Sequence, residues 1–299
     1  MTRGKRKTEP ARWSPPNLKG KVAVVTGASR GAGRGIACVL GECGATVYVT
    51  GRSVRGGPTT DNMPGTIDDT AEQVSARGGA GIPVRCDHTG DKQVEALFKR
   101  VKKEQGRLDL LVNNAWGGYE GPGGPLSMAP LWEQPLRHWD GMFTAGLRAQ
   151  LVASYFGVPL MLTQKRGLIV STVAMVGEKY LGTVFYYVSK HAVMRMIHAL
   201  ACELRQYNVA AVALAPGFMR TERILKFFKT DEQHWQTNPA LKQTESPEYV
   251  GRAVAMLAAD RKLMQKTGKA FRSGELARTY GFPDVDGRRV PPFPTADEL

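Results

Sequence analysis

Tyr186 and Lys190 are the two side chains whose types and spacing are best suited to acid–base chemistry. Residues four apart lie on one face of a helix, so the ammonium would stand beside the phenol. A nearby positive charge favours the phenolate and lowers the pKa of a tyrosine from its usual value of about 10. Such a pair would act as a general acid or base near neutral pH. A surface lysine that only covers a tyrosine ring would show the same spacing.

A glycine-rich loop, residues 26–33 with the sequence TGASRGAG, could hold a phosphate group. It follows an apolar run, 22–25, that is typical of a buried parallel strand, and it leads into a helical pattern at 36–40. Backbone N–H groups and the positive end of a helix favour an anion at this place. The spacing is G-x-x-x-G-x-G, and no Gly-Lys-Ser/Thr follows, so the loop is not a P-loop. Glycines that serve only a tight turn are the alternative.

The elements that must position these residues alternate along the chain from residue 20 to about 275. This alternation of strands and helices predicts a single doubly wound Rossmann-type α/β domain, with a parallel seven-stranded sheet and helices on both faces. Right-handed crossovers would place a ligand at the carboxyl ends of the strands. The predicted strands are 22–26, 46–50, 81–86, 108–112, 168–172, 209–215 and 270–273, and helical patterns such as 91–103 and 191–205 lie between them.

Two further motifs follow strands in the same order: Asn113-Asn114-Ala115 after the fourth and Pro216-Gly217 after the sixth. With the glycine loop and the tyrosine–lysine pair, this set resembles the short-chain dehydrogenase/reductase family over roughly residues 18–285. The stretch 274–287 resembles a narrower branch, that of dehydrogenase/reductase family member 1 and its bacterial relatives. The resemblance implies hydride transfer between a nicotinamide and a carbonyl or secondary alcohol, with Tyr186 protonating the oxygen.

The resemblance also implies which residues bind the dinucleotide. Lys190 would hold the nicotinamide ribose in addition to assisting Tyr186, and Asp87 would hydrogen-bond the adenine. Gly27, Ser29, Arg30, Gly31 and Gly33 would cradle the phosphates, Asn113 and Ala115 would line the ribose side, and Pro216, Gly217 and Thr221 would contact the nicotinamide end.

The end of the second strand bears on the choice between the two nicotinamide cofactors. An acidic residue there would hold the 2′-hydroxyl of NAD, but the strand ends in Gly51-Arg52 with no acid. Arg30 and Arg52 together could clamp a 2′-phosphate through charge-assisted hydrogen bonds. The sequence therefore predicts NADP(H) rather than NAD(H).

Two side chains that the family usually has are absent. The expected serine before the tyrosine falls on Val173 or Ala174, neither of which donates a side-chain hydrogen bond. Thr172 is the nearest hydroxyl on the strand face of position 174, about 7 Å further back, whereas Ser171 points to the other face. Thr172 is our candidate for the role of the serine. Gly146 stands where the family has an asparagine, so an NADP(H)-binding scaffold or redox sensor with little turnover remains the alternative function.

Four segments lie outside the regular alternation. Residues 116–135 are rich in Gly and Pro and predict an irregular loop. Residues 218–245 form either a substrate lid or a satellite hydrophobic cluster, and the aromatic side chains of both segments favour a bulky apolar substrate. The basic segment 1–17 is expected to be a disordered tail, and 286–299 to be an extended C-terminal tail because of its prolines.

Composition limits the remaining function classes. Part of the net charge of +14 lies in the basic N-terminal tail, and the rest is scattered rather than striped, which argues against a nucleic-acid partner. No apolar run reaches the roughly 18 residues of a membrane span, and we expect no secretory signal. The four cysteines show no metal-like spacing, which favours free thiols in the reducing cytoplasm. The family habit of homodimers or homotetramers is the expectation for the assembly.

Overall fold

Seven parallel strands form one sheet in the order β3-β2-β1-β4-β5-β6-β7, which confirms the predicted architecture. The structure is a computed structural model that describes residues 12–120, 129–175, 180 and 183–298. The direction of sheet growth reverses between β1 and β4, and ligands of open α/β sheets bind at the carboxyl ends of the strands at such a point. The strands are β1 Val22–Val25, β2 Thr46–Gly51, β3 Ala80–Arg85, β4 Leu110–Asn113, β5 Gly167–Thr172, β6 Val209–Ala215 and β7 Ala270–Arg272.

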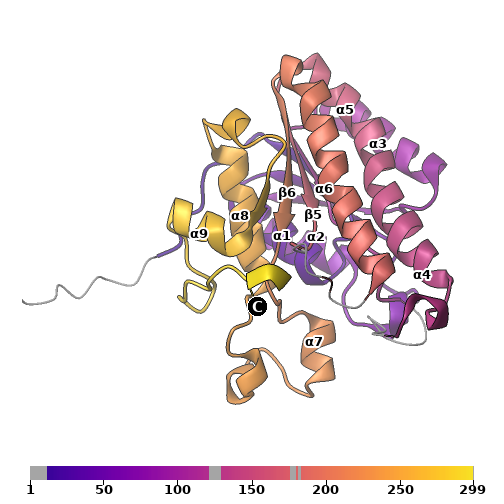
Figure 1. The fold of residues 1–299 in the computed structure, drawn as a ribbon. Helices are drawn as coiled ribbons and strands as arrows, with labels where there is room; N and C mark the ends of the chain where they lie inside the picture. The colour runs from indigo at the N-terminus through magenta and orange to yellow at the C-terminus, as the bar shows by residue number, and fades with distance from the viewer. Residues whose placement is uncertain (1–11, 121–128, 176–179, 181–182, 299) are drawn as a thin grey trace, which may run out of the picture.

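Helices cover both faces of the sheet (Figure 1). Helices α1, α2, α8 and α9 share one hydrophobic core with the sheet, and α3, α5 and α6 share the other. The short α4 leads toward α5, and α7 lies apart from the sheet. The bounds are α1 Gly31–Glu42, α2 Ile67–Ala76, α3 Asp91–Gln105, α4 Arg137–Trp139, α5 Ala149–Thr163, α6 Val184–Leu204, α7 Glu222–Phe227, α8 Pro247–Ala259 and α9 Ser273–Tyr280.

The apolar runs form central strands because their side chains pack into both hydrophobic cores. On β1, Ala23 and Val25 pack into one core, and Val22 and Val24 pack into the other. This is the alternation that a pleated strand imposes when helices cover both of its faces. Continuous apolar sequence is thus required here, and it is what made the strands recognisable.

One helical segment departs from α geometry. Between α4 and α5 the chain forms the π-helix η3, Asp140–Arg148. Such segments are rare and occur frequently at functional sites. The remaining short helices are the 3₁₀ turns η1 Thr60–Asn62, η2 Leu131–Glu133, η4 Arg205–Tyr207, η5 Trp235–Thr237, η6 Pro239–Leu241, η7 Leu263–Gln265 and η8 Ala296–Glu298.

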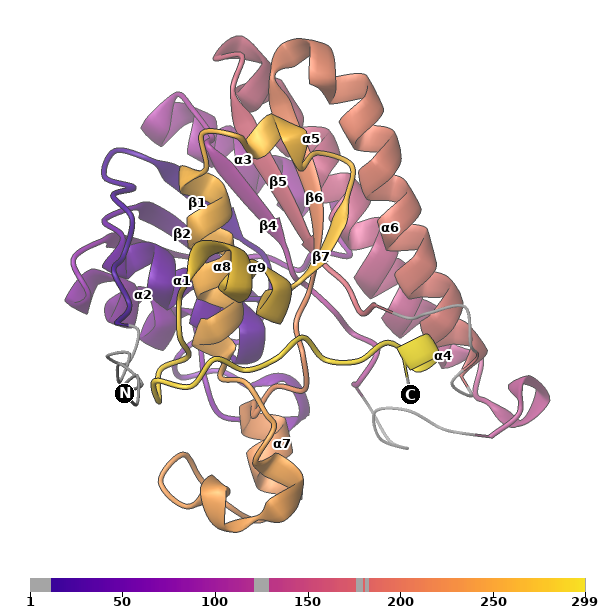
Figure 2. The same ribbon diagram turned by 60° about the vertical axis from the view of Figure 1, so that its left-hand side comes forward.

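The segment 218–245 leaves the body of the domain and returns to it, as both views show (Figures 1 and 2). Its two ends are joined by a parallel bridge between Met219 and Glu245 and by a 2.9 Å hydrogen bond from Glu245 N to Phe218 O. Beyond this base it has a small hydrophobic cluster of its own, which contains the buried residues Leu225, Trp235 and Leu241.

Both ends of the described chain pack on the domain. After α9 the C-terminal segment passes between α9 and α7 (Figure 2), and Tyr249 Oη donates a 2.9 Å hydrogen bond to Val290 O. The expected boundary at residue 285 therefore falls inside a packed segment. Residues 1–11 of the expected basic tail lie outside the described residues, but Trp13 contacts Phe282 edge to face, with 6.1 Å between ring centroids. In the described part of the chain, no helix has the length and apolar character to cross a membrane.

Candidate active site

The predicted site residues lie along one edge of the sheet, where the strands end. Parallel strands bring all their carboxyl ends to this edge, so residues far apart in the sequence meet there. The glycine loop follows β1, Arg52 follows β2, Asp87 follows β3, Asn114 and Ala115 follow β4, Thr172 ends β5, and Pro216 and Gly217 follow β6.

Two glycines of the glycine loop, Gly27 and Gly33, leave no room for a side chain. Gly27 and Gly31 have positive φ angles of 64° and 56°, which favour glycine. A Cβ on Gly33 would lie 2.3 Å from the carbonyl oxygen of Gly27, and a Cβ on Gly27 would lie 2.8 Å from the Cα of Ala115. The loop is thus a tight backbone cradle against the end of β4, which fits the close approach of a dinucleotide.

Asn114 braces this loop, a role that was not assigned from the sequence. Its Nδ2 donates 3.0 Å hydrogen bonds to the carbonyl oxygens of Thr26 and Gly27. Asn113, by contrast, is buried and donates a 2.9 Å hydrogen bond to Ser154 Oγ on α5. Neighbouring residues at the end of a strand point to opposite faces. The Asn113 side chain therefore faces the core, and the motif supplies the loop with Asn114 and the Ala115 backbone.

A carboxylate stands at the N-terminus of α1. Glu222 Oε2 on α7 accepts a 2.9 Å hydrogen bond from Gly31 N, and Glu222 Oε1 lies 3.0 Å from Arg34 Nη2. Thr221, a predicted nicotinamide contact, lies beside the same loop, because its Cγ2 would be 3.6 Å from a Cβ on Gly31. The Glu222 oxygens stand in for phosphate oxygens, and they show that this helix end accepts an anion. A bound pyrophosphate would have to replace them.

Arg52 follows β2, and the side chain of Arg30 in the glycine loop reaches Ser53 beside it, but both arginines are engaged with protein groups. Arg30 Nη2 donates to Ser53 Oγ at 3.0 Å and to the carbonyl oxygen of Gly65 at 3.1 Å. Arg52 Nη2 forms a 2.6 Å ion pair with Glu120 Oε1. Glu120 thus holds Arg52 where the sequence predicts a 2′-phosphate.

Asp87 is fixed at the turn between β3 and α3. Its Oδ1 accepts hydrogen bonds from Thr89 N at 3.0 Å and from Thr89 Oγ1 at 2.8 Å. These bonds hold the carboxylate on the same edge of the sheet as Arg52. The predicted contact with an adenine stays a prediction.

The predicted acid–base pair lies on α6 beneath a tryptophan. Lys190 Nζ is 3.4 Å from the ring centroid of Trp116 and 5.4 Å from that of Tyr186. Burial lowers the pKa of Lys190 to about 7. Burial also raises the pKa of Tyr186 well above 10, and the neighbouring Tyr119 adds to this rise. The expected lowering of the tyrosine pKa by the lysine is therefore absent from this structure, because both groups lose their hydration.

Aromatic rings surround the Tyr186 phenol. Its hydroxyl shares a hydrogen bond with that of Tyr119. The ring of Trp116 meets both tyrosine rings edge to face, with 5.9 Å between centroids in each pair. Trp116 and Tyr119 come from the loop after β4, which the sequence identified only as irregular and aromatic. Residues 121–128 of this loop lie outside the described residues.

Thr172 ends β5 as predicted, but its hydroxyl is directed at the backbone. Its Oγ1 donates to the carbonyl oxygen of Asn113 at 3.4 Å, and Val173 beside it is buried. The role of Thr172 in place of the absent serine stays a prediction.

Gly217, a predicted nicotinamide contact, lies against a buried carboxyl group. A Cβ on Gly217 would lie 3.0 Å from Glu245 Oε2, which accepts a 2.6 Å hydrogen bond from Ser273 Oγ. Burial raises the pKa of Glu245 to about 8. This carboxyl group links the loop after β6 to the start of α9.

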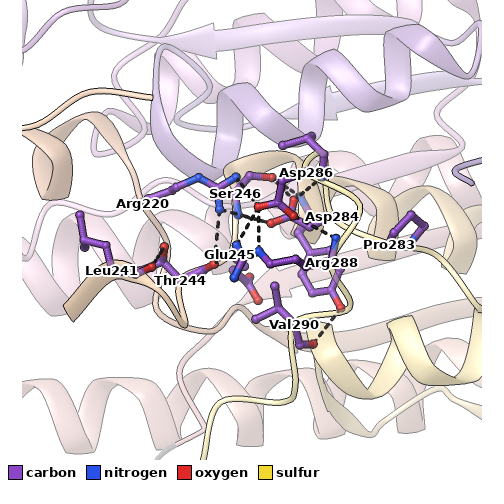
Figure 3. Close-up of polar contacts among 12 residues, drawn as sticks. Arg220, Leu241, Thr244, Glu245, Ser246, Pro283, Asp284, Asp286, Arg288 and Val290 are labelled. Carbon is purple, nitrogen blue, oxygen red and sulfur yellow. Dashed lines mark hydrogen bonds and ion pairs between the residues drawn. The ribbon is translucent and has the colours of Figure 1, made fainter. Parts of the chain in front are cut away.

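A cluster of charged groups holds the base of segment 218–245 against the C-terminal segment (Figure 3). Arg220, with a side chain only 1% exposed, lies 3.3 Å from Asp284 Oδ2 and 3.5 Å from Asp286 Oδ2. Ser246 hydrogen-bonds Asp284 through both its hydroxyl and its N–H. Arg288 donates to the carbonyl oxygen of Thr244 at 3.0 Å. Because residues 284–288 come from beyond α9, the C-terminal segment anchors the segment that carries Thr221 and Glu222.

Comparison with known proteins agrees with this geometry. The short chain dehydrogenase family model matches residues 21–232. The human protein named dehydrogenase/reductase SDR family member 1 is 40% identical over 281 residues, which cover 91% of this chain and 86% of the relative. Its mouse counterpart is 39% identical over 279 residues, with the same two coverages.

Solved structures share the fold. A structure of 7α-hydroxysteroid dehydrogenase, complexed with NADH and 7-oxo glycochenodeoxycholic acid, is 25% identical and superposes with a TM-score of 0.68. The superposition covers 86% of this chain and 93% of the solved chain. The family model and the relatives span the edge on which the glycine loop, Tyr186 and Lys190 meet. The chain therefore belongs to the short-chain dehydrogenase/reductase family, and it is an oxidoreductase that acts on CH–OH and C=O groups with a nicotinamide dinucleotide.

Proposed function

We propose that this protein is an NADP(H)-dependent reductase or dehydrogenase of bulky, apolar carbonyls and secondary alcohols. The observation that carries the proposal is the arrangement of Tyr186 and Lys190 among aromatic rings, at the sheet edge that also holds the glycine loop. Trp116 and Tyr119 would present apolar surface to a substrate whose oxygen reaches the Tyr186 hydroxyl. Such a surface favours large hydrophobic substrates over small polar ones.

Hydride transfer is the chemistry that a bound nicotinamide supplies, and the chain provides the proton and the setting. Tyr186 gives its hydroxyl proton to the carbonyl oxygen as charge develops there. Lys190, which is charged below a pH of about 7, would hold the nicotinamide ribose and stabilise the phenolate that remains. The glycine loop would hold the pyrophosphate with its N–H groups once Glu222 has withdrawn. The aromatic rings exclude water from the phenol.

The choice of NADP(H) is supported by Arg52 at the end of β2 and by the absence of an acidic residue after that strand. We expect NADPH to bind roughly 10- to 100-fold more tightly than NADH, the range that a hydrogen-bonded charge contributes. Titration of both cofactors, followed by fluorescence, measures this ratio. Arg52→Ser should remove most of the preference, whereas Arg55→Ser, on an arginine paired with Asp69 and Glu72, should not. Tighter binding of NADH would contradict the proposal.

The activity itself is tested by a panel of ketones and secondary alcohols with NADPH consumption or formation as the readout. The solved hydroxysteroid dehydrogenase described above holds a steroid-sized ketone, which makes such ketones a useful part of the panel. We expect turnover with bulky apolar ketones and little with short polar ones. Tight NADPH binding without turnover on any member would instead favour the alternative of a scaffold or redox sensor, in keeping with the absent serine and asparagine.

We also propose a homodimer or homotetramer in a reducing cytoplasm. Helices α5 and α6 expose apolar side chains side by side in the fold, including Leu151 at 49%, Tyr155 at 73% and Val188 at 47%. Burial of these side chains against a second copy would remove that surface from water. Free thiols at all four cysteines support a reducing compartment.

A further inference from the structure

Trp116 makes the closest aromatic contact of the Lys190 ammonium in the described chain. The 3.4 Å separation between Lys190 Nζ and the ring centroid is well within the range of about 6 Å for cation–π attraction. Lys190 is only 7% exposed, so water competes little with the ring. The second ring, that of Tyr186, is 5.4 Å away. The tryptophan face therefore replaces part of the hydration that the buried ammonium has lost.

Two glycines make room for this ring. A Cβ on Gly146 would lie 2.8 Å from Trp116 Cε3 and Cζ3, and a Cβ on Gly118 would lie 2.5 Å from Trp116 Cζ2. Real Cβ atoms do not approach other heavy atoms so closely, so a side chain at either position would displace the ring from its place over Lys190. Gly146 lies in the π-helix η3, and Gly118 lies in the same loop as Trp116.

Backbone packing fixes the loop that carries the tryptophan. A Cβ on Gly141 would lie 2.7 Å from the carbonyl oxygen of Gly117, and one on Gly117 would lie 2.8 Å from Ala145 Cβ. The backbone of the loop after β4 thus rests directly on η3. This contact sets the height of Trp116 above α6, where Lys190 and Tyr186 lie.

We propose that Trp116 is a positioning residue that holds the Lys190 ammonium beside Tyr186, and that Gly146 provides the space that its ring requires. The proposal rests on the proposed roles of Tyr186 and Lys190. It accounts for the glycine at 146, where the family resemblance predicted an asparagine: any larger side chain would meet the ring. The tryptophan after Ala115 and the glycine in η3 are then one structural solution.

The proposal predicts a pH dependence for cofactor binding. Among the described residues, the titratable group beside Lys190 is the Tyr186 phenol on the same helix, whose ring centroid is 5.4 Å from Lys190 Nζ. Tyr119 hydrogen-bonds this phenol, and burial raises the pKa of Tyr119, a rise that the charge of Arg223 on α7 partly offsets. The pKa of Lys190 is about 7, and a bound dinucleotide favours the ammonium. Binding therefore takes up a proton above pH 7, and the Kd for NADPH should rise up to tenfold per pH unit there.

Trp116→Leu tests the aromatic contact because leucine keeps Lys190 buried but offers no π face. NADPH affinity begins to fall at the pH where Lys190 loses its proton. Loss of a desolvated cation–π contact should lower that pH by about one unit. Binding at pH 8 should then weaken about tenfold while binding at pH 5 stays unchanged. Calorimetry in buffers of different ionisation enthalpy measures both the Kd and the protons taken up. Trp116→Phe, which keeps a ring, should retain the wild-type profile, as should Trp139→Leu on an exposed tryptophan.

A double-mutant cycle tests the role of Gly146. Gly146→Ala should shift the pH profile as Trp116→Leu does, since its Cβ displaces the ring. In a Trp116→Ala background the same substitution should have almost no effect, because no ring remains to be displaced. Thermal unfolding of each variant shows whether it is folded. If Gly146→Ala does not fold, the comparison of Trp116→Leu with Trp116→Phe still tests the contact between the ring and Lys190.

Two results would overturn the proposal for Trp116, and one of them would also overturn the proposed role of Lys190. If Lys190→Met abolishes the pH dependence of NADPH binding but Trp116→Leu does not shift it, only the role of Trp116 is wrong. If Lys190→Met itself leaves the pH dependence unchanged, the role of Lys190 in the proposed function is wrong, and that of Trp116 falls with it.

Discussion

Tyr186→Phe is expected to lower the turnover number by about 10²- to 10⁴-fold and to leave NADPH affinity close to that of the wild type. The substitution removes only the hydroxyl, which is the group that we propose protonates the carbonyl oxygen. The ring that meets Trp116 edge to face, 5.9 Å between centroids, is retained, so the packing of the site should be preserved. Steady-state rates with the best ketone of the panel, together with fluorescence titration of NADPH, measure the two effects separately.

Tyr187→Phe is the matched control for this experiment. Tyr187 is the next residue on α6, and its ring lies 4.4 Å from that of His191, centroid to centroid. It has no lysine four residues later, because position 191 is a histidine. We expect this variant to retain its activity. Full activity in Tyr186→Phe, or equal losses in both variants, would show that the acid lies elsewhere.

Arg220→Met is expected to lower the free energy of unfolding by about 3–5 kcal/mol, the cost of breaking a buried ion pair by removing one partner. The Asp284 carboxylate is fully buried, and its partner Arg220 is 1% exposed. Without the guanidinium, the Asp284 charge would keep only its hydrogen bonds from Ser246 and the backbone N–H of Val285. The contact of the guanidinium with the Trp235 ring, 4.4 Å from Arg220 Cζ to the centroid, would also be lost. Urea unfolding followed by tryptophan fluorescence measures the change.

Two further variants show whether a loss of stability comes from the buried ion pair of Arg220 with Asp284. Arg223→Met removes the 2.7 Å ion pair between Arg223 and Asp61, whose side chains are 35% and 25% exposed, and it should cost at most about 1 kcal/mol. Asp284→Asn in the Arg220→Met background removes the remaining charge and should restore part of the lost stability. A loss for Arg220→Met no larger than that for Arg223→Met would mean that the cluster does not anchor segment 218–245.

Much of the fold could be predicted because a doubly wound sheet has strong local signals. Buried parallel strands require continuous apolar runs, and β1 and β6 are such runs in the sequence. Helices between them and the right-handed crossover rule then leave few topologies open. The predicted strand boundaries agree with those observed to within two residues, and the order of the motifs along one edge of the sheet follows from the topology.

The side-chain partners at the site could not be predicted in the same way. The sequence identified the Asn113-Asn114-Ala115 motif but not that Asn114 braces the glycine loop, because this depends on the direction in which β4 ends. Glu222 at the N-terminus of α1 lies 191 residues from its partner Gly31, and no local pattern signals such a contact. The long-range pairing of Arg220 with Asp284 is equally invisible in the sequence.

The sequence by itself determined the sheet and the placement of a tyrosine–lysine pair on one helix, because these depend on periodicity and spacing, and the order of its motifs along the chain indicated the family. Only the tertiary structure decided what surrounds that pair. The height of Trp116 above Lys190 follows from the packing of the loop after β4 on η3, and the rise in the pKa of Tyr186 follows from burial. Packing distances and desolvation arise between elements distant in the sequence, so they become defined only when the chain is folded.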